Sequence, residues 1–367
     1  MDLFIFAAEP SADLHGEKLL KALLEKNPYL KIEGVGGPKM RATGLKCIMP
    51  MENFQVMGFI DVIKHLPQLI KHFYTLRAYI LKAHPQAVLF IDYPGFNLKM
   101  EEHLRKKGYK GKLIHYICPS IWAWGKKRIF TLEKNLDLLL SILPFEKDLF
   151  KNLKLAVEYV GNPLVQRIQE YQYKPFDFPK DKKIIAVFPG SRRKEIERNF
   201  PLQLKVLKQF PDYALCVSIA NSRFLPLIKE LLQKEEVRAH LIPGEYTYEL
   251  MKVAYIAVAK SGTVTLELGL HATPSIVTYA ISFLDMLAVK YFFKPDLPFY
   301  SLVNILCKKE VFPELMGPKF TEKNLYEAVK NLLAGTFQVK EECEHLKQIL
   351  TTKKASEEAA SHILNSL

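Results

Sequence analysis

The chain has 367 residues, 49% of them hydrophobic, and its 52 basic residues against 39 acidic ones give a net charge of +13. This length fits two domains of about 180 residues better than one core, and the hydrophobic share excludes a disordered chain. The positive charge favours anionic partners such as a sugar nucleotide, an anionic lipid or nucleic acid. Basic-aromatic motifs typical of RNA binding are not visible, so no nucleic-acid partner is expected.

Cysteine usage and hydropathy exclude two further classes. The five cysteines are scattered, odd in number and form no CxxC pair, which is typical of reduced packing residues in a cytosolic protein. The N-terminus lacks the basic residues of a signal peptide and is expected to form a first strand. No uninterrupted apolar segment reaches the ~18 residues of a membrane-spanning helix, so we expect a soluble protein or one that lies on a membrane surface.

Short apolar runs alternate with helical patterns along the chain, which predicts an α/β protein with parallel sheets covered by helices. Strands are expected at 3–7, 32–35, 88–91, 113–117, 138–142 and 157–160 in the first half, and at 184–188, 214–218, 239–242, 256–259 and 275–279 in the second. A Gly161-Asn162-Pro163 turn and a Pro- and Lys-rich stretch at 173–180 indicate a hinge and a linker. We therefore predict two Rossmann-like domains, residues 1–170 and 171–345, which face each other across a cleft. A helical tail at 346–367 would pack on the first domain or, in a homodimer, on a partner subunit.

Two strand ends in the second half predict an anion site. The apolar run 184–188 leads into Pro189-Gly190-Ser191-Arg192, where backbone N–H groups, a hydroxyl and guanidinium groups gather at a helix start. The run 255–259 leads into Lys260-Ser261-Gly262-Thr263, and Glu267 follows one helical turn later. Two strand ends that each suit a phosphate, with a carboxylate nearby, favour a nucleotide diphosphate and its ribose over a lone phosphate.

Carboxylates follow two strands of the first half. Asp92 comes directly after a fully apolar strand; this is usually a turn-forming position, but it also suits a general base. Glu9 follows the first strand, where ligands bind in parallel sheets. Ser11, two residues later, has the ordinary interpretation of a helix cap.

The segment Val56–Leu81 combines apolar residues at helical spacing with lysines and histidines on other faces. A helix packed on a sheet explains one apolar stripe, and an anionic membrane surface or an acyl chain would explain the additional apolar residues. In the membrane interpretation, Leu66, Leu69 and Phe73 face the lipid. Asn304 stands among apolar residues and is either a satisfied turn residue or a group that binds a substrate hydroxyl or phosphate.

Nine short motifs in fixed order resemble the lipid-A-disaccharide synthase family over nearly the whole chain. They are Ala8–Asp13, Gly36–Met40, Met57–Gly58, Asp92–Asn97, Pro119–Trp124, Leu143–Glu146, Val160–Leu164, Pro189–Arg192 and Ser261–Thr263. The resemblance implies a metal-independent, cofactor-free inverting glycosyltransferase of the GT-B fold. It implies transfer of 2,3-diacylglucosamine from UDP-2,3-diacylglucosamine to 2,3-diacylglucosamine 1-phosphate (lipid X), which gives a β-1,6-linked disaccharide 1-phosphate and UDP. It also implies a peripheral protein on the cytoplasmic face of a Gram-negative inner membrane, bound to the anionic surface through Val56–Leu81.

The resemblance also assigns roles to single residues. Asp92 is the candidate base, and Glu9 orients the acceptor or shares that role. The predicted substrate-binding residues are Ser11, Asn97, Ser191, Arg192, Ser261, Gly262, Thr263, Glu267 and Asn304. The chain departs from the family pattern at Ala8, Ala12 and Asn162, where the family usually has two glycines and a histidine, so Asn162 receives no catalytic role.

Two other interpretations stay open at this point. Another GT-B enzyme, a UDP-N-acetylglucosamine transferase or 2-epimerase, would share the nucleotide-binding half but would not need the apolar segment Val56–Leu81. A nonenzymatic lipid- or nucleotide-binding relative would not need Glu9, Asp92, Arg192 and Asn304 together.

Overall fold

The structure is a computed structural model of the chain. It describes all residues except 55–58, 123–124, 126–127, 282–296, 336–338 and 351–352, and of residues 59–65 it describes the backbone alone. Of the motifs and segments named above, residues 56–58, 123–124 and, within the tail, 351–352 therefore lie outside the described residues. The chain divides into two compact units: residues 1–166 together with 350–367, and residues 167–349. The sequence placed this boundary at 170 and the start of the tail at 346.

The first unit contains a parallel sheet with strand order β3-β2-β1-β4-β5-β6-β7. Its strands are β1 (Leu3–Phe6), β2 (Ile32–Gly36), β3 (Lys46–Pro50), β4 (Ala87–Ile91), β5 (Lys112–Tyr116), β6 (Leu138–Ser141) and β7 (Ala156–Tyr159). Its helices are α1 (Pro10–Lys26), α2 (Pro38–Ala42), α3 (Phe59–Ala83), α4 (Pro94–Lys106), α5 (Arg128–Asn135), α6 (Glu146–Leu149) and α16 (Ala355–Leu364), and α7 (Pro163–Gln169) crosses into the second unit. The strand order reverses between β1 and β4, which is where doubly wound sheets bind ligands.

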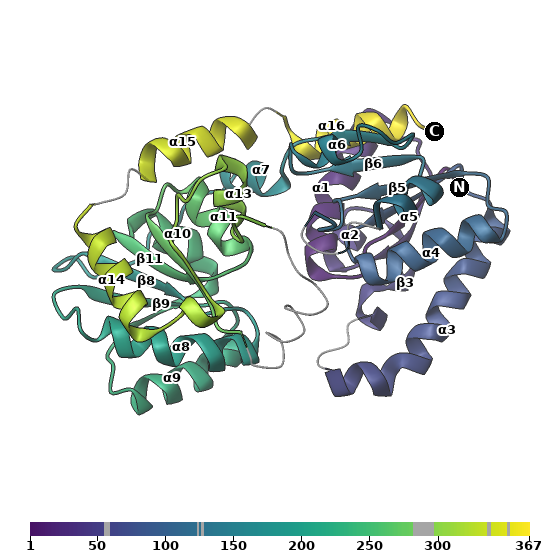
Figure 1. Ribbon diagram of the computed structural model, residues 1–367. Helices are drawn as coiled ribbons and strands as arrows, with labels where there is room; N and C mark the ends of the chain where they lie inside the picture. Colours follow the sequence, from purple (N-terminus) through teal and green to yellow (C-terminus); the bar gives the residue numbers. More distant parts are fainter. Residues whose placement is uncertain (55–58, 123–124, 126–127, 282–296, 336–338, 351–352) are drawn as a thin grey trace. The chain divides into compact units, whose positions relative to one another are not determined.

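Alternation of side chains along β1 builds two cores, one on each face of this sheet. Leu3 and Ile5 pack with α1, β4 and α16 on one face, whereas Phe4 and Phe6 pack with α3, α4 and α5 on the other. The C-terminal helix α16 contributes Ile363, which is fully buried, and lies against α1 of the same chain (Figure 1). The end of the predicted tail is thus covered without a second copy.

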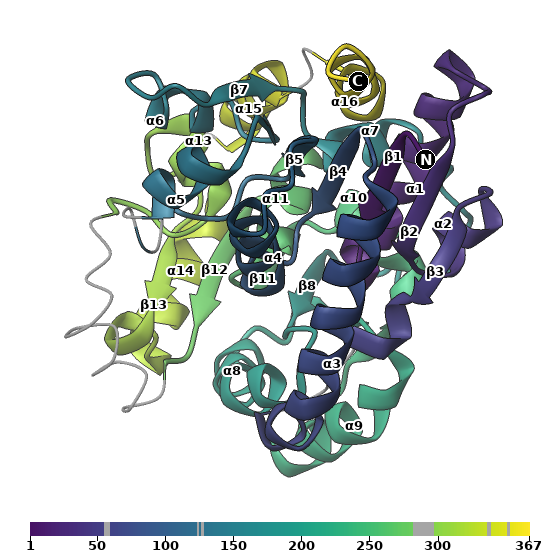
Figure 2. The same ribbon diagram turned by 90° about the vertical axis from the view of Figure 1, so that its right-hand side faces the viewer.

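Helix α3 presents two adjacent faces with different surroundings. Leu76 and Ile80 are buried on the sheet, and Leu69 and Phe73 pack against the same core. The expectation that Leu69 and Phe73 face lipid is therefore wrong. Leu66, Ile70 and Tyr74, spaced four residues apart, are each 47% exposed and form what we call the outer stripe. In Figure 2, α3 is a single long helix whose first half extends past the strands of its own unit. Within the described residues, no helix has both the length and the apolarity needed to cross a bilayer.

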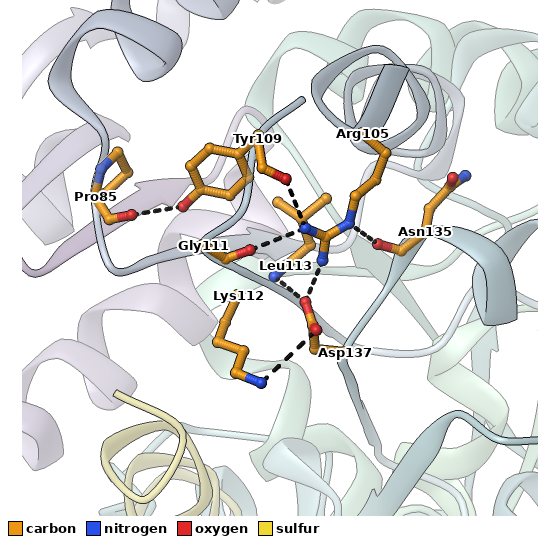
Figure 3. Close-up of polar contacts among 8 residues, drawn as sticks. All are labelled: Pro85, Arg105, Tyr109, Gly111, Lys112, Leu113, Asn135 and Asp137. Atoms are coloured by element: carbon orange, nitrogen blue, oxygen red, sulfur yellow. Dashed lines mark hydrogen bonds and ion pairs between the residues drawn. The ribbon is translucent and has the colours of Figure 1, made fainter. Parts of the chain in front are cut away.

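Arg105 of α4 lies at the amino ends of β5 and β6, opposite the carboxyl ends of the strands where ligands bind, and joins several segments there (Figure 3). Its guanidinium group donates to the carboxylate of Asp137, which also accepts from the Leu113 N–H at 2.8 Å. The same group donates to three backbone carbonyls, those of Tyr109, Gly111 and Asn135. One planar cation with five donors thus joins α4 to the starts of β5 and β6. This end of the sheet carries no group of the predicted site.

The second unit repeats the design with strand order β10-β9-β8-β11-β12-β13, all parallel. Its strands are β8 (Ile184–Phe188), β9 (Ala214–Ile219), β10 (His240–Pro243), β11 (Ile256–Lys260), β12 (Ser275–Tyr279) and β13 (Glu314–Met316). Its helices are α8 (Arg193–Leu207), α9 (Leu225–Lys234), α10 (Thr247–Val253), α11 (Thr263–Leu270), α13 (Leu302–Cys307), α14 (Glu322–Leu333) and α15 (Val339–Leu350). Two Rossmann-like units confirm the predicted α/β fold class, while the edge strands β3 and β13 were not predicted.

Candidate active site

Glu9, Ser11 and Asp92 come together at the switch point of the first sheet. Glu9 precedes α1 just after β1, and Asp92 directly follows β4, the strand beside it. The Ser11 hydroxyl donates to Oδ2 of Asp92 at 3.4 Å. Glu9 follows β1, which pairs with β4, so it lies at the same end of the sheet as Asp92; burial, together with the negative charge of Glu9, raises the pKa of Tyr93. Two carboxylates and a hydroxyl therefore share one strand-end site.

Asp92 is held in an unusual backbone conformation. Asp92 and Tyr93 have φ of +52° and +50°, a left-handed pair that costs roughly 1–2 kcal/mol per residue. The Asp92 N–H donates to the Tyr116 carbonyl at 3.0 Å, and the Asn97 side-chain amide donates to the Asp92 carbonyl. Asn97 is fully buried, and no described group donates to its Oδ1. Asn97 therefore supports the turn through its side-chain N–H, and its contact with a substrate stays a prediction.

Asp13 of α1 fixes the backbone at the start of α2. Its carboxylate accepts three backbone hydrogen bonds at the start of α2: from Gly37 at 2.8 Å, from Lys39 at 3.1 Å and from Met40 at 3.1 Å. A side chain of α1 thus caps a different helix, because the first N–H groups of α2 have no partner within that helix. The motifs Ala8–Asp13 and Gly36–Met40 are therefore two parts of one structural contact.

The second unit contains a pocket of about 270 Å³ at the carboxyl ends of β8, β9 and β11. Five predicted residues line it: Ser191, Ser261, Gly262, Thr263 and Glu267. The pocket lies at the switch point between β8 and β11, the position where nucleotides bind in this class of sheet. The N-terminus of α11 opens onto it, and no described group accepts from the N–H groups of Gly262 and Thr263. These donors suit a phosphate.

Glu195 and Lys260 also line this pocket and were not among the predicted residues. Lys260 Nζ lies 2.9 Å from Glu195 Oε1, and both side chains are 14% exposed. Burial alone would raise the pKa of Glu195, but hydrogen bonds from Lys260 and from the Ser191 N–H outweigh it and lower the pKa. Arg192 is 81% exposed, contacts Glu195 at 3.1 Å and does not line the pocket. Lys260 precedes Ser261 at the end of an apolar strand, a position that could have indicated its role.

Glu267 reaches the pocket from α11, as the sequence predicted, but it already has partners. Arg167 of α7 forms an ion pair with its Oε1, and the Tyr248 hydroxyl donates to the same oxygen at 2.9 Å. Neither Arg167 nor Tyr248 lines the pocket. Sequence reasoning missed both, since only the fold brings α7 and α10 beside α11.

Asn304 lies apart from the pocket in a network of its own. Its amide donates to the Phe312 carbonyl and to Glu314 Oε1, both at 2.8 Å, and its Oδ1 accepts from the N–H groups of Val311 and Phe312, both at 2.9 Å. The residue is fully buried. All four hydrogen-bonding positions of the amide are used, so a substrate could bind Asn304 only by replacing one of these bonds.

The structure thus gathers most of the predicted residues into two groups, one in each unit, while Arg192 and Asn304 lie outside both. Glu9, Ser11 and Asp92 form the first, with Asn97 behind them, and the pocket residues form the second. Among the described residues, no group of three or more His, Cys, Asp or Glu is arranged to hold a metal ion. The first group can accept a proton, and the second can bind a phosphorylated ligand.

Comparison with known proteins adds sequence relatives and structures of similar fold. A lipid-A-disaccharide synthase of Chlamydia pneumoniae is 40% identical over 99% of this chain, and the chain spans only 62% of that relative's length. Lipid-A-disaccharide synthase 1 of Legionella pneumophila is 32% identical over 96% of this chain and 93% of its own.

The solved structure of MnaA from S. aureus with UDP has a TM-score of 0.63 at 15% identity, covering 100% of this chain and 98% of that one. WaaG, a glycosyltransferase involved in lipopolysaccharide biosynthesis, has a TM-score of 0.56 at 12% identity, covering 99% of each chain. At such identities the two structures support the fold alone. Residues 3–366 match the sequence model of the lipid-A-disaccharide synthetases, and the chain belongs to that family.

Proposed function

We propose that the protein transfers 2,3-diacylglucosamine from UDP-2,3-diacylglucosamine to lipid X, giving the β-1,6-linked disaccharide 1-phosphate and UDP. The family match over residues 3–366 carries this proposal. The two groups of side chains support it, because glycosyl transfer needs a proton acceptor for the incoming hydroxyl and a binding site for the departing nucleotide.

In the second unit, UDP would occupy the pocket at the ends of β8 and β11. The N–H groups at the start of α11 and the hydroxyls of Ser191, Ser261 and Thr263 would donate to the diphosphate. Lys260 would exchange its contact with Glu195 for a phosphate oxygen, and the exposed Arg192 could turn toward the same anion. Such donors stabilise the negative charge that grows on UDP as the glycosidic bond breaks. Glu267 would accept hydrogen bonds from the ribose.

In the first unit, Asp92 would take the proton of the acceptor hydroxyl. The hydroxyl oxygen then forms a bond to the anomeric carbon, and the bond from that carbon to the β-phosphate oxygen breaks, its electron pair leaving with UDP. The Ser11 hydroxyl donates to the Asp92 carboxylate, and the Asn97 amide fixes the Asp92 backbone. Glu9, at the end of the neighbouring strand, would orient the acceptor or share the proton.

Both proposed substrates carry acyl chains, so we also propose that the protein binds an anionic inner-membrane surface through α3. The outer stripe, Leu66, Ile70 and Tyr74, supplies the apolar contact, and the exposed Lys71 beside it supplies positive charge. The proposed docking surface is therefore narrower than the predicted segment Val56–Leu81.

The reaction can be tested with the purified full chain. Incubation with UDP-2,3-diacylglucosamine and lipid X should give the tetra-acyl disaccharide 1-phosphate by mass spectrometry, and Asp92→Ala should give none. UDP-N-acetylglucosamine, offered alone and with lipid X, should be left unchanged. Turnover of that soluble sugar nucleotide without any disaccharide from the acylated pair would favour a UDP-N-acetylglucosamine transferase or 2-epimerase instead.

A further inference from the structure

The two carboxylate oxygens of Glu267 have different surroundings. Oε1 receives the ion pair from Arg167 and the 2.9 Å hydrogen bond from the Tyr248 hydroxyl. No described residue donates to Oε2. Since Glu267 lines the pocket and its two partners do not, the partners hold the carboxylate from behind. One oxygen is anchored by protein, and the other is left for a ligand.

The anchor is a closed triangle of hydrogen bonds. Arg167 donates through Nη2 to the Tyr248 hydroxyl as well as to Glu267, and the Tyr248 hydroxyl donates to Glu267. The guanidinium carbon also lies 5.5 Å from the centre of the Tyr248 ring, and Tyr248 is 8% exposed. Each member restricts the other two, so Glu267 has little freedom to rotate away from the pocket.

The triangle also bears on the charge of Glu267. Burial raises the pKa of this carboxyl, and the charge of Arg167 and the hydrogen bonds from Tyr248 and Arg167 oppose that rise. His271, the C-cap residue of α11, contacts the backbone carbonyl of Glu267 at 2.7 Å, and burial lowers the pKa of its imidazole. Glu249 of α10 accepts instead from the Tyr171 hydroxyl. Arg167 is thus the cation that faces the carboxylate from the described elements packed around it.

We propose that Arg167 and Tyr248 are positioning residues that anchor Oε1 of Glu267, so that Oε2 stays available to accept a hydrogen bond from a ribose hydroxyl. The inference rests on the proposed function, because it places a uridine nucleotide in this pocket. It predicts a preference for UDP over 2′-deoxy-UDP that depends on two residues which do not touch the nucleotide.

Calorimetric titration of the full chain with UDP and with 2′-deoxy-UDP, at pH 6.0 and pH 8.0, tests this. Arg167→Gln should weaken UDP binding roughly ten- to a hundredfold, the usual effect of losing a charged hydrogen bond. It should also reduce the preference for UDP over 2′-deoxy-UDP. Without the cation the pKa of Glu267 rises further, so the loss should be larger at pH 6.0 than at pH 8.0. Arg167→Lys should restore part of the affinity at pH 6.0.

A matched control removes one arginine charge from the same unit beside its edge strand β10, away from the pocket. Arg238 is exposed and precedes β10, so Arg238→Gln should bind both nucleotides as the wild type does at both pH values. Tyr248→Phe keeps the ring packed and removes only the hydroxyl. This variant tests the proposal if Arg167→Gln lowers the melting temperature of the protein. It should weaken UDP binding severalfold and reduce the preference for the ribonucleotide.

Unchanged affinities and an unchanged preference in a folded Arg167→Gln or Tyr248→Phe variant would overturn the proposal. So would a wild type that bound UDP and 2′-deoxy-UDP equally. The proposed transfer reaction fails separately: a wild type that prefers UDP but forms no disaccharide would refute the reaction and leave this inference standing. A wild type without affinity for UDP would refute the assignment of the pocket itself, and both proposals with it.

Discussion

The outer stripe of α3 leads to a prediction that separates membrane binding from folding. The double substitution Leu66→Ser/Ile70→Ser removes two side chains that are each 47% exposed. Leu76→Ser removes a side chain of the same helix that is 1% exposed. We expect the first variant to lose affinity for membranes and to keep its stability, and the second to lose stability.

The expected magnitudes follow from burial. Full burial of a leucine or isoleucine side chain is worth about 1.5–3 kcal/mol, so covering the exposed half of each stripe residue contributes about 1 kcal/mol. The double variant should therefore bind vesicles about thirtyfold more weakly, which corresponds to about 2 kcal/mol. For Leu76, loss of a buried leucine costs roughly 2–5 kcal/mol. At about 2–4 °C per kcal/mol for a unit of this size, its melting temperature should fall by about 10 °C.

Co-sedimentation of the full chain with vesicles that contain phosphatidylglycerol measures the partition coefficient, and calorimetry measures the melting temperature. The double variant should melt within about 2 °C of the wild type, because exposed substitutions usually change stability by less than about 0.5 kcal/mol. A double variant with wild-type affinity for vesicles would refute the docking surface. One that melted as low as Leu76→Ser would show that the stripe belongs to the core.

Three further predictions concern the two halves of the site. Asp92→Ala should abolish transfer while calorimetry still detects UDP binding, and an active variant would remove Asp92 from the mechanism. Lys260→Met removes the cation that is 14% exposed beside Glu195 and should weaken UDP binding roughly tenfold or more; equal affinity would show that Lys260 serves Glu195 alone. Gly190→Ala places a side chain at φ of +127°, where its Cβ would lie 2.9 Å from the Cβ of Glu195, so it should cost about 1–3 kcal/mol in thermal unfolding and weaken UDP binding; wild-type stability and affinity would contradict the strain argument.

Central strands could be predicted from the sequence because burial on both faces requires continuous apolar runs. Each residue of β4 and β8 is buried, and both strands stand out in the sequence for that reason. The edge strands lack this signal. β3 has exposed residues at both ends, and β13 is three residues long with only intermediate burial. Their pairing is decided by the neighbouring strand, which no local pattern reveals.

The orientation of α3 could not be predicted for a similar reason. Residues 66, 70 and 74 and residues 69, 73, 76 and 80 occupy neighbouring faces of one helix, and both sets are apolar or aromatic. Periodicity shows that α3 has a broad apolar surface, but the rotation of the helix on its sheet decides which part remains exposed. The ring of Phe96 from α4 packs edge-to-face with the ring of Phe73, with ring centres 5.2 Å apart, and this contact helps to fix that rotation.

Amides in the first turn of a helix illustrate the limit for site residues. Asn97 and Asn304 stand where a ligand could be expected, yet both are fully buried and bonded to backbone groups of their own unit. A sequence shows which groups can form hydrogen bonds but does not show whether the backbone has already used them. Carboxylates at strand ends, such as Glu9 and Asp92, are a stronger signal of a functional edge, since ionised groups are rarely buried without a partner, and their roles stay predictions.

The sheets of the two units reverse their strand order in the same way, but the residues at the reversal point differ in charge. In each sheet the strand order reverses at one point, β1 beside β4 in the first unit and β8 beside β11 in the second. The residues that follow these strands decide what the edge can bind: carboxylates at Glu9 and Asp92 in the first, and in the second Lys260 with the N–H groups of Gly262 and Thr263, from which no described group accepts. Glu195 and Glu267 add negative charge to the second edge, but each is paired with a cation, Lys260 or Arg167. The second edge therefore carries donors that suit an anion, and the first edge carries the carboxylate of Asp92, which accepts a hydrogen bond from the Ser11 hydroxyl.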